Sequence, residues 1–145
     1  MKRFQFPLDR VRRWRSEQAS FEELKLQQLR AELDRLAAAR AASEAEAAET
    51  AQQVLSQPRI DPVELTTLET YRMHLRRRIY ELDNLIDQCA SKIARQRERV
   101  IEARRQFELL DRLYQKAWNE WSAAVNKQQE ELAAEMFLAK SARSR

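Results

Sequence analysis

The sequence predicts an all-α protein, a long antiparallel two-helix coiled-coil hairpin whose second helix is longer than the first. Its 145 residues include no glycine and only three prolines, so few positions favour a tight turn. Charged residues make up 34% of the chain, and apolar residues recur at alternating steps of three and four along its second half. We expect a single coiled-coil domain over residues 1–145.

A first helix is predicted over about residues 7–56. Pro7 suits the first helical position, and Asp9 falls in the first turn, where the helix dipole favours an anion. The apolar stripe is expected to change register after Leu24, as in the stutter of a coiled coil. Its members are Leu8, Val11, Trp14, Phe21 and Leu24, followed in the shifted register by Leu26, Leu29, Leu33 and Leu36.

The stretch SQPRIDP is the only proline-bearing break inside the chain and predicts a turn over residues 57–61. Pro58 stops the first helix, because proline disfavours helical geometry in the residue before it. Asp61 then supplies an N-cap, Pro62 the first helical position and Glu64 the capping-box position of a second helix. A short connection of this kind favours antiparallel neighbours.

The second helix is predicted over about residues 62–138, followed by a basic tail over 139–145. Its heptad seam is the strongest pattern in the sequence, and Arg72 and Gln96 are its two polar members. The seam positions are Leu65, Leu68, Arg72, Leu75, Ile79, Leu82, Ile86, Cys89, Ile93, Gln96, Val100, Ala103, Phe107, Leu110, Tyr114, Ala117, Trp121 and Ala124.

The unequal helix lengths predict that the second helix extends beyond the first. At about 1.5 Å per residue, helices of roughly 50 and 75 residues span about 75 and 115 Å. The start of the first helix should then lie opposite Leu110 to Tyr114, and roughly the last 25 residues should have no partner within the chain. Trp14 and Phe107 are expected to pack in the seam. The candidates for docking to another molecule are the aromatic N-terminal arm, Trp118, Trp121, Phe137 and Leu138.

The composition argues against catalysis and against a cofactor. Phosphate-binding loops, dinucleotide fingerprints and nucleophile elbows depend on glycine, which this chain lacks. The lone His74 and the lone Cys89 have no spacing that could form a metal site or a nucleophile and base. We expect Cys89 to be a small buried seam residue and His74 to be solvated.

The chain start predicts a cytoplasmic protein. Its basic opening is not followed by the apolar region of a secretory signal. No stretch approaches 18 uncharged apolar residues, so no membrane span is expected.

The opening FQFPLDRVRRWRSEQ resembles the start of the FliJ family of flagellar export proteins, which begin with an aromatic and basic segment, a Leu-xx-Val pair and an Arg-rich first turn. The residues that carry this likeness are Phe4, Phe6, Leu8, Val11 and Arg15. The layout is similar too: a first helix, a short break, ELTTLETYRMHLRRRI, and a late QKAWNEWSAAVNKQQEELAAEMF before a basic tail.

The resemblance implies a non-enzymatic component of the flagellar type III export apparatus, cytoplasmic and peripheral at the inner membrane through that apparatus. It implies a fold similar to the coiled-coil stalk of the rotary ATPase γ subunit. The paired terminal ends would enter a hexameric export ATPase and promote its assembly, the other end would engage the cytoplasmic domain of the export gate, and some family members escort export chaperones.

Two sets of contact residues accompany this reading. Tyr71 and Leu75 match the family's gate contact, although Leu75 also lies on the seam, which makes a purely structural role the alternative. The residues expected to contact the ATPase, from the resemblance and from their place near the chain ends, are Phe4, Phe6, Leu8, Val11, Trp14, Arg15, Trp118 and Trp121.

Other readings stay open. The stalk of a virulence type III injectisome shares the layout. A self-associating scaffold would pair its second helices in parallel. An Arg-rich coiled coil could bind nucleic acid, but acidic residues are interleaved with the arginines and the net charge is only +4, which disfavours this reading. No small-molecule substrate is expected.

Overall fold

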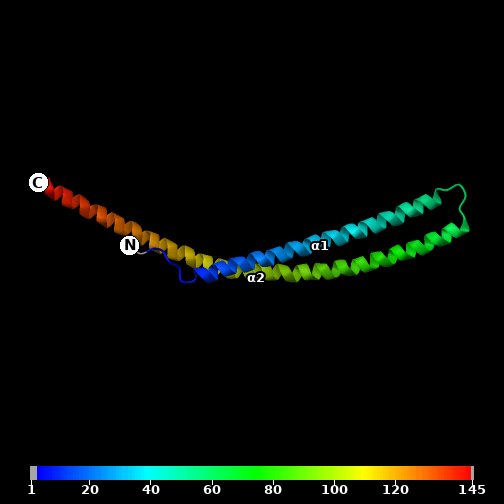
Figure 1. The fold of residues 1–145 in the computed structure, drawn as a ribbon, viewed down its shortest axis with the longest axis horizontal. Coiled ribbons are helices and arrows are strands. Elements are labelled where there is room, and N and C mark those ends of the chain that lie inside the picture. Colours follow the sequence, from blue (N-terminus) through cyan, green and yellow to red (C-terminus); the bar gives the residue numbers. More distant parts are fainter. Residues whose placement is uncertain (1–2, 145) are drawn as a thin grey trace. The chain divides into compact units, whose positions relative to one another are not determined.

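A computed structural model describes residues 3–144, which form two antiparallel α-helices (Figure 1). Helix α1 covers Asp9–Leu55, helix α2 covers Pro62–Arg143, and residues 56–61 connect them. The helices have 47 and 82 residues. The predicted all-α hairpin with a longer second helix is therefore confirmed.

The tertiary contacts divide the described residues into two units. One contains those of Met1–Ser20 and Ile101–Arg145, and the other contains Phe21–Val100. Both helices contribute a segment to each unit, so each unit is an antiparallel pair with its own contacts.

The start of α2 follows the predicted capping pattern. Asp61 Oδ1 accepts a hydrogen bond from the backbone N–H of Val63 at 3.0 Å, and the Asp61 carbonyl accepts one from Leu65 at 3.1 Å. The side chain thus satisfies a donor that the first helical turn would otherwise leave without a partner. The N-cap prediction at Asp61 is confirmed.

Helix α1 begins two residues later than predicted. The backbone N–H of Asp9 bonds to the Phe6 carbonyl at 3.0 Å, which closes a turn at Pro7 and Leu8. The first helical bond runs from the Arg12 N–H to the Leu8 carbonyl at 2.9 Å. Pro7 therefore lies just before the helix instead of opening it.

Helix α2 continues to Arg143, so the prediction that a basic tail outside the helix begins at residue 139 is wrong for residues 139–143. Two alanines at 139 and 142 favour helix, and neither glycine nor proline interrupts this stretch. Lys140 and Arg143 suit the last turn, where the helix dipole favours cations. Arg145 of the predicted tail lies outside the described residues.

In the unit Phe21–Val100, the core forms where the seam of α2 meets a leucine stripe on α1. Leu26 packs with Cys89, Ile93 and Val100, and Leu29, Leu33 and Leu36 cover this cluster. Cys89 is buried, as expected for a seam residue, and its thiol lies 3.4 Å from the Leu29 carbonyl. Gln96 is also buried and donates to the Glu22 carbonyl at 2.9 Å.

The predicted seam of α2 is confirmed along almost its whole length. Every seam position is buried or half-buried except Leu65 and Ala124, which are the first and the last. Near the connection, residues such as Val54, Val63 and Leu68 line a hollow of about 430 Å³.

The predicted stripe at the start of α1 is wrong. Five apolar residues are between 42% and 52% exposed: Leu8, Val11, Trp14, Phe21 and Leu24. Arg12 and Ala19 lie 14 and 7 residues before Leu26, so they continue its heptad register backwards, and the less exposed positions there also include Ser16 and Glu22. No stutter is needed, because the small Ser16 and Ala19 permit close packing and Arg12 covers an aromatic ring.

Candidate functional site

An aromatic cluster forms where the N-terminal segment, residues 3–6, packs on α2. The Phe4 ring meets Trp118 edge to face, with centroids 5.0 Å apart and planes at 89°, and lies 5.7 Å from Trp121. Phe4 and Phe6 each lie 5.5 Å from Tyr114 in edge-to-face geometry. Aromatic pairs favour this arrangement, because the positive ring edge meets the negative ring face.

The N-terminal segment shows that Trp118 and Trp121 have a partner within the chain, contrary to prediction. An extended chain advances about 3.3 Å per residue, whereas a helix rises about 1.5 Å. The two steps from Phe6 to Phe4 therefore cover about the same length as the four from Tyr114 to Trp118. Sequence reasoning counted only helical rise and so placed the chain start too far from the tryptophans.

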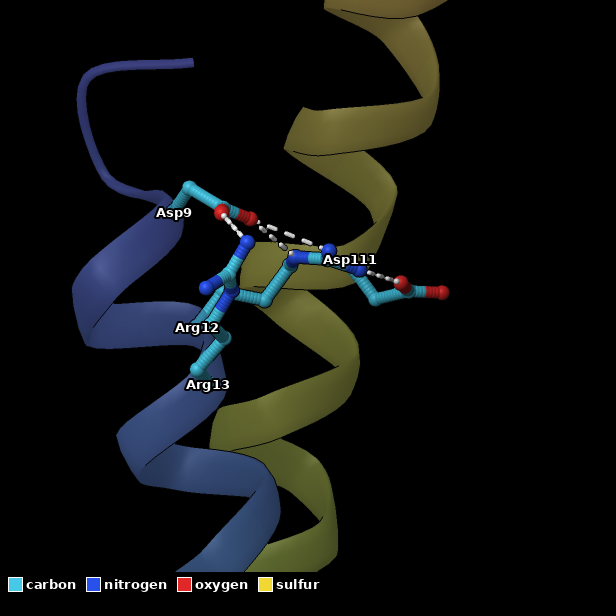
Figure 2. Close-up of polar contacts among 4 residues, drawn as sticks. All are labelled: Asp9, Arg12, Arg13 and Asp111. Carbon is cyan, nitrogen blue, oxygen red and sulfur yellow. Dashed lines mark hydrogen bonds and ion pairs between the residues drawn. The ribbon is translucent and has the colours of Figure 1, made fainter.

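A polar clamp centred on Arg12 fixes the start of α1 beside α2 (Figure 2). Arg12 Nη1 donates to Asp111 Oδ1 at 3.1 Å, while its Nε and Nη2 donate to Asp9 Oδ1 at 3.1 and 3.0 Å. Arg13 Nη2 pairs with Asp9 Oδ2 at 3.0 Å. The Arg12 guanidinium also stacks 3.9 Å from the Tyr114 ring centroid. As predicted, the start of the first helix lies opposite Leu110 to Tyr114.

The environment keeps this guanidinium charged. Burial lowers the pKa of Arg12, but the hydrogen bonds to Asp9 and Asp111 and the charge of Asp9 together raise it by more. The net pKa of Arg12 is therefore raised, and the clamp keeps its charge over the physiological pH range.

Beyond the cluster, α2 carries an open hollow of about 910 Å³, here called the α2 groove. Its lining includes Phe4, Trp118, Val125, Glu131, Leu132 and Glu135. Positions 126–140 of α2 are all exposed. The groove thus combines an aromatic end with aliphatic side chains, two carboxylates and the guanidinium of Arg3.

The structure brings together only part of the predicted ATPase-binding set. Phe4, Phe6, Trp118 and Trp121 form the cluster, whereas Leu8, Val11 and Trp14 are exposed on α1 and Arg15 stacks 4.7 Å from the Trp14 ring. Trp14 was expected in the seam and is 48% exposed, so that prediction is wrong.

Two further docking candidates lie apart from the groove. Phe137 and Leu138 are exposed and follow Leu132 by five and six residues. At about 100° per residue, these steps turn them away from the helix face that carries Leu132.

The predicted gate residues lie in the unit Phe21–Val100 and differ in exposure. Leu75 is buried in the seam at 3% exposure. Tyr71 is half-buried, and its hydroxyl donates to Glu46 Oε1. This hydrogen bond raises the pKa of Tyr71, with burial and the charge of Glu46 acting in the same direction. His74 is exposed, as expected.

Sequence reasoning missed Arg12, Asp111, Val125 and Leu132 as site residues. Arg12 lies 14 residues before Leu26, so extending the heptad backwards would have placed it on the seam. Val125 and Leu132 are seven residues apart and lie one position off the heptad of Tyr114 and Trp121. This apolar repeat in a shifted register could have identified Val125 and Leu132 from the sequence.

Two classes of feature are missing from the described part of the chain. Across residues 3–144, no group of three or more His, Cys, Asp or Glu side chains is placed to hold a metal ion. Neither described helix is long and apolar enough to cross a membrane.

Comparison with known proteins leaves the family of this chain open. No family model matches its sequence, and no curated protein and no solved structure matches it. The resemblance to the FliJ family therefore stays a hypothesis.

Proposed function

We propose that this protein is a non-enzymatic stalk of a flagellar type III export apparatus, which binds a hexameric export ATPase with its terminal end and an export gate with the other. The observation that carries the proposal is the cluster of Phe4, Trp118 and Trp121. It joins the chain start to the late part of α2 and leaves an amphipathic groove open beside it.

The shape and chemistry of this end support the proposal. A stalk that enters a ring needs a narrow element with an apolar face. The part of α2 that continues as a single helix beyond the start of α1 is such an element. The Arg12 clamp holds the start of α1 against α2, so both chain ends are presented together.

The other end of the hairpin offers a second contact surface. Tyr71 is half-buried beside the hollow of about 430 Å³ near the connection, and apolar residues such as Val63 are exposed there. We propose this region as the gate contact, with Tyr71 on the surface and Leu75 holding the helices together beneath it.

The direct test is the effect of the purified protein on the ATPase activity of its export ATPase. The wild-type chain should stimulate hydrolysis, and Trp118→Ala should reduce the stimulation at least about tenfold, as expected for loss of an aromatic hot spot. Leu109→Ala is the matched control, because Leu109 is an exposed apolar residue of the same helix outside the groove. Stimulation that survives Trp118→Ala, or that falls equally with the control, would contradict the proposal.

A further inference from the structure

The unit built from the chain start and the late part of α2 carries two exposed apolar faces, one with mainly acidic and the other with mainly basic residues beside it. The first is the α2 groove, whose lining includes Val125 and Leu132, the carboxylates of Glu131 and Glu135 to one side of them, and Arg3. The second is the outer side of the start of α1, where Leu8, Val11 and Trp14 are exposed. Both faces belong to the same unit of the chain.

The charges beside the second face are mainly basic, although Asp9 and Glu17 line the same hollow as Arg10, Arg13 and Trp14. Residues 10–15 read RVRRWR and contain four arginines and no acid. Arg12 is bound to Asp9 and Asp111, whereas Arg10 is exposed and the side chain of Arg13 is 76% exposed. Arg10 and Arg13 are three residues apart, and Glu131 and Glu135 are four apart, so each pair projects from one side of its helix.

We propose that the occupant of the α2 groove is the start of α1 from a second copy of this chain, and that the protein alone forms an antiparallel two-fold dimer. The apolar side chains of Val11 and Trp14 would cover Val125 and Leu132, with Arg10 and Arg13 meeting Glu131 and Glu135. Because each copy carries both faces, a two-fold axis makes the contact twice.

The geometry permits both contacts at once. The start of α1 lies at the level of Asp111 and Tyr114, and Leu132 lies 18 residues beyond Tyr114, or about 27 Å along α2. In an antiparallel pair, this offset brings each α1 start opposite the groove of the other copy. The start of α1 is then enclosed between its own α2 and the α2 of its partner.

This inference does not rest on the proposed function, and it has a consequence for it. The dimer would cover the groove that we propose to meet the ATPase, so the two interactions would exclude each other. The dimer test uses the chain alone, and its failure would leave the ATPase proposal untouched.

The test is a charge exchange on the full chain, followed by sedimentation velocity over a concentration series at physiological salt. One variant carries Glu131→Lys and Glu135→Lys, and the other carries Arg10→Glu and Arg13→Glu. Each alone should raise the dimer dissociation constant at least about tenfold, because like charges then face each other across the interface. Mixed in equal amounts, the two variants should form a heterodimer as stable as the wild type, since both of its contacts pair opposite charges.

The control is Glu69→Lys with Glu81→Lys, which makes the same change in net charge at two exposed positions of the other unit. It should dimerise like the wild type. Circular dichroism checks that every variant keeps its helix content. A wild-type chain that stays monomeric, a dimer that survives both charge reversals, or a mixture that fails to restore the dimer would overturn the proposal.

Discussion

The guanidinium of Arg12 lies 3.9 Å from the ring centroid of Tyr114, and this contact joins the start of α1 to α2. The same guanidinium binds Asp111 on α2 and Asp9 on α1. One side chain thus combines a stacked cation with two ion pairs and stands where a coiled coil ordinarily has an apolar residue. Its position sets the level at which the N-terminal segment meets the tryptophans.

Replacing Arg12 with alanine should lower the free energy of unfolding by about 1–2 kcal/mol, from loss of the stacked cation and of partly exposed ion pairs. Urea unfolding followed by circular dichroism measures this change. Arg35→Ala is the control, because Arg35 is largely exposed and its ion pair with Glu32 lies within α1, in the other unit. It should cost less than about 0.5 kcal/mol. Equal losses for the two variants would show that the clamp contributes nothing beyond a surface ion pair.

Replacing Phe4 with alanine should expose Trp118 and Trp121 to water. In a Trp14→Phe background, which leaves these two tryptophans as the fluorophores, the emission maximum should move to longer wavelength and quenching by acrylamide should increase. Gln5→Ala, at an exposed position of the same segment, should change neither. An unchanged spectrum in the Phe4 variant would mean that the N-terminal segment does not cover the tryptophans in solution.

Gln96→Leu should stabilise the protein by about 1 kcal/mol, because a seam position prefers an apolar residue and the buried amide serves chiefly to fix the register. The substitution removes two hydrogen bonds of the Gln96 amide, one to the Glu22 carbonyl at 2.9 Å and one to Glu22 Oε2 at 2.5 Å. The carbonyl is also available to its own helix, and Lys25 Nζ lies 3.8 Å from Glu22 Oε1. Thermal unfolding of the two proteins measures the difference. A lower midpoint for Gln96→Leu would show that hydrogen bonding by the Gln96 amide contributes more stability than an apolar side chain at this seam position.

Leu75→Ala should lower the free energy of unfolding by about 2–4 kcal/mol, since it opens a cavity in the seam at a residue only 3% exposed. A loss of gate binding in this variant would therefore report unfolding as well as contact. Met73→Ala, at an exposed apolar position two residues away, should leave the denaturant midpoint nearly unchanged. Similar losses for both variants would contradict the seam position of Leu75.

The hydrogen bond between Tyr71 and Glu46 should contribute stability that depends on pH. The folded pKa of Tyr71 is raised, so this contribution is complete below the ordinary tyrosine pKa of about 10 and is lost as the pH rises through the folded pKa. Wild type and Tyr71→Phe should therefore differ in urea midpoint at neutral pH and converge only as the pH rises through the raised folded pKa of Tyr71. A difference that persists unchanged at higher pH would mean that the phenol proton is not shared with Glu46.

Much of the hairpin could be predicted because one heptad repeat of apolar residues continues along most of α2. Leu68 to Trp121 follow a single heptad phase, and Asp61 with Pro62 marks the helix start by local chemistry alone. The start of α1 could not be read in this way. Its large apolar residues suggested that their side of the helix would face α2. The side with Arg12, Ser16 and Ala19 packs on α2 instead, because the heptad register of α2 is unbroken and fixes the register of its partner helix.

The aromatic residues of the candidate site could be predicted from the sequence, but the residues that line the groove beyond them could not. Phe4 and Trp118 stood out as aromatic residues near the two chain ends, and the structure places them in contact. The groove beyond them depends on Val125 and Leu132, which follow a register shifted by one residue. Heptad counting from Tyr114 passes over such positions, because it assumes that one partner helix continues alongside.

The central proposal, that the terminal end of this protein binds an export ATPase, is tested most directly by capture of the full chain from its own cell lysate at physiological salt after nuclease treatment. We predict recovery of an export ATPase and a large gate protein with the wild type. Trp118→Ala should lose the ATPase and keep the gate protein. Recovery of neither protein with a folded wild-type chain would contradict the stalk reading and favour a self-associating scaffold.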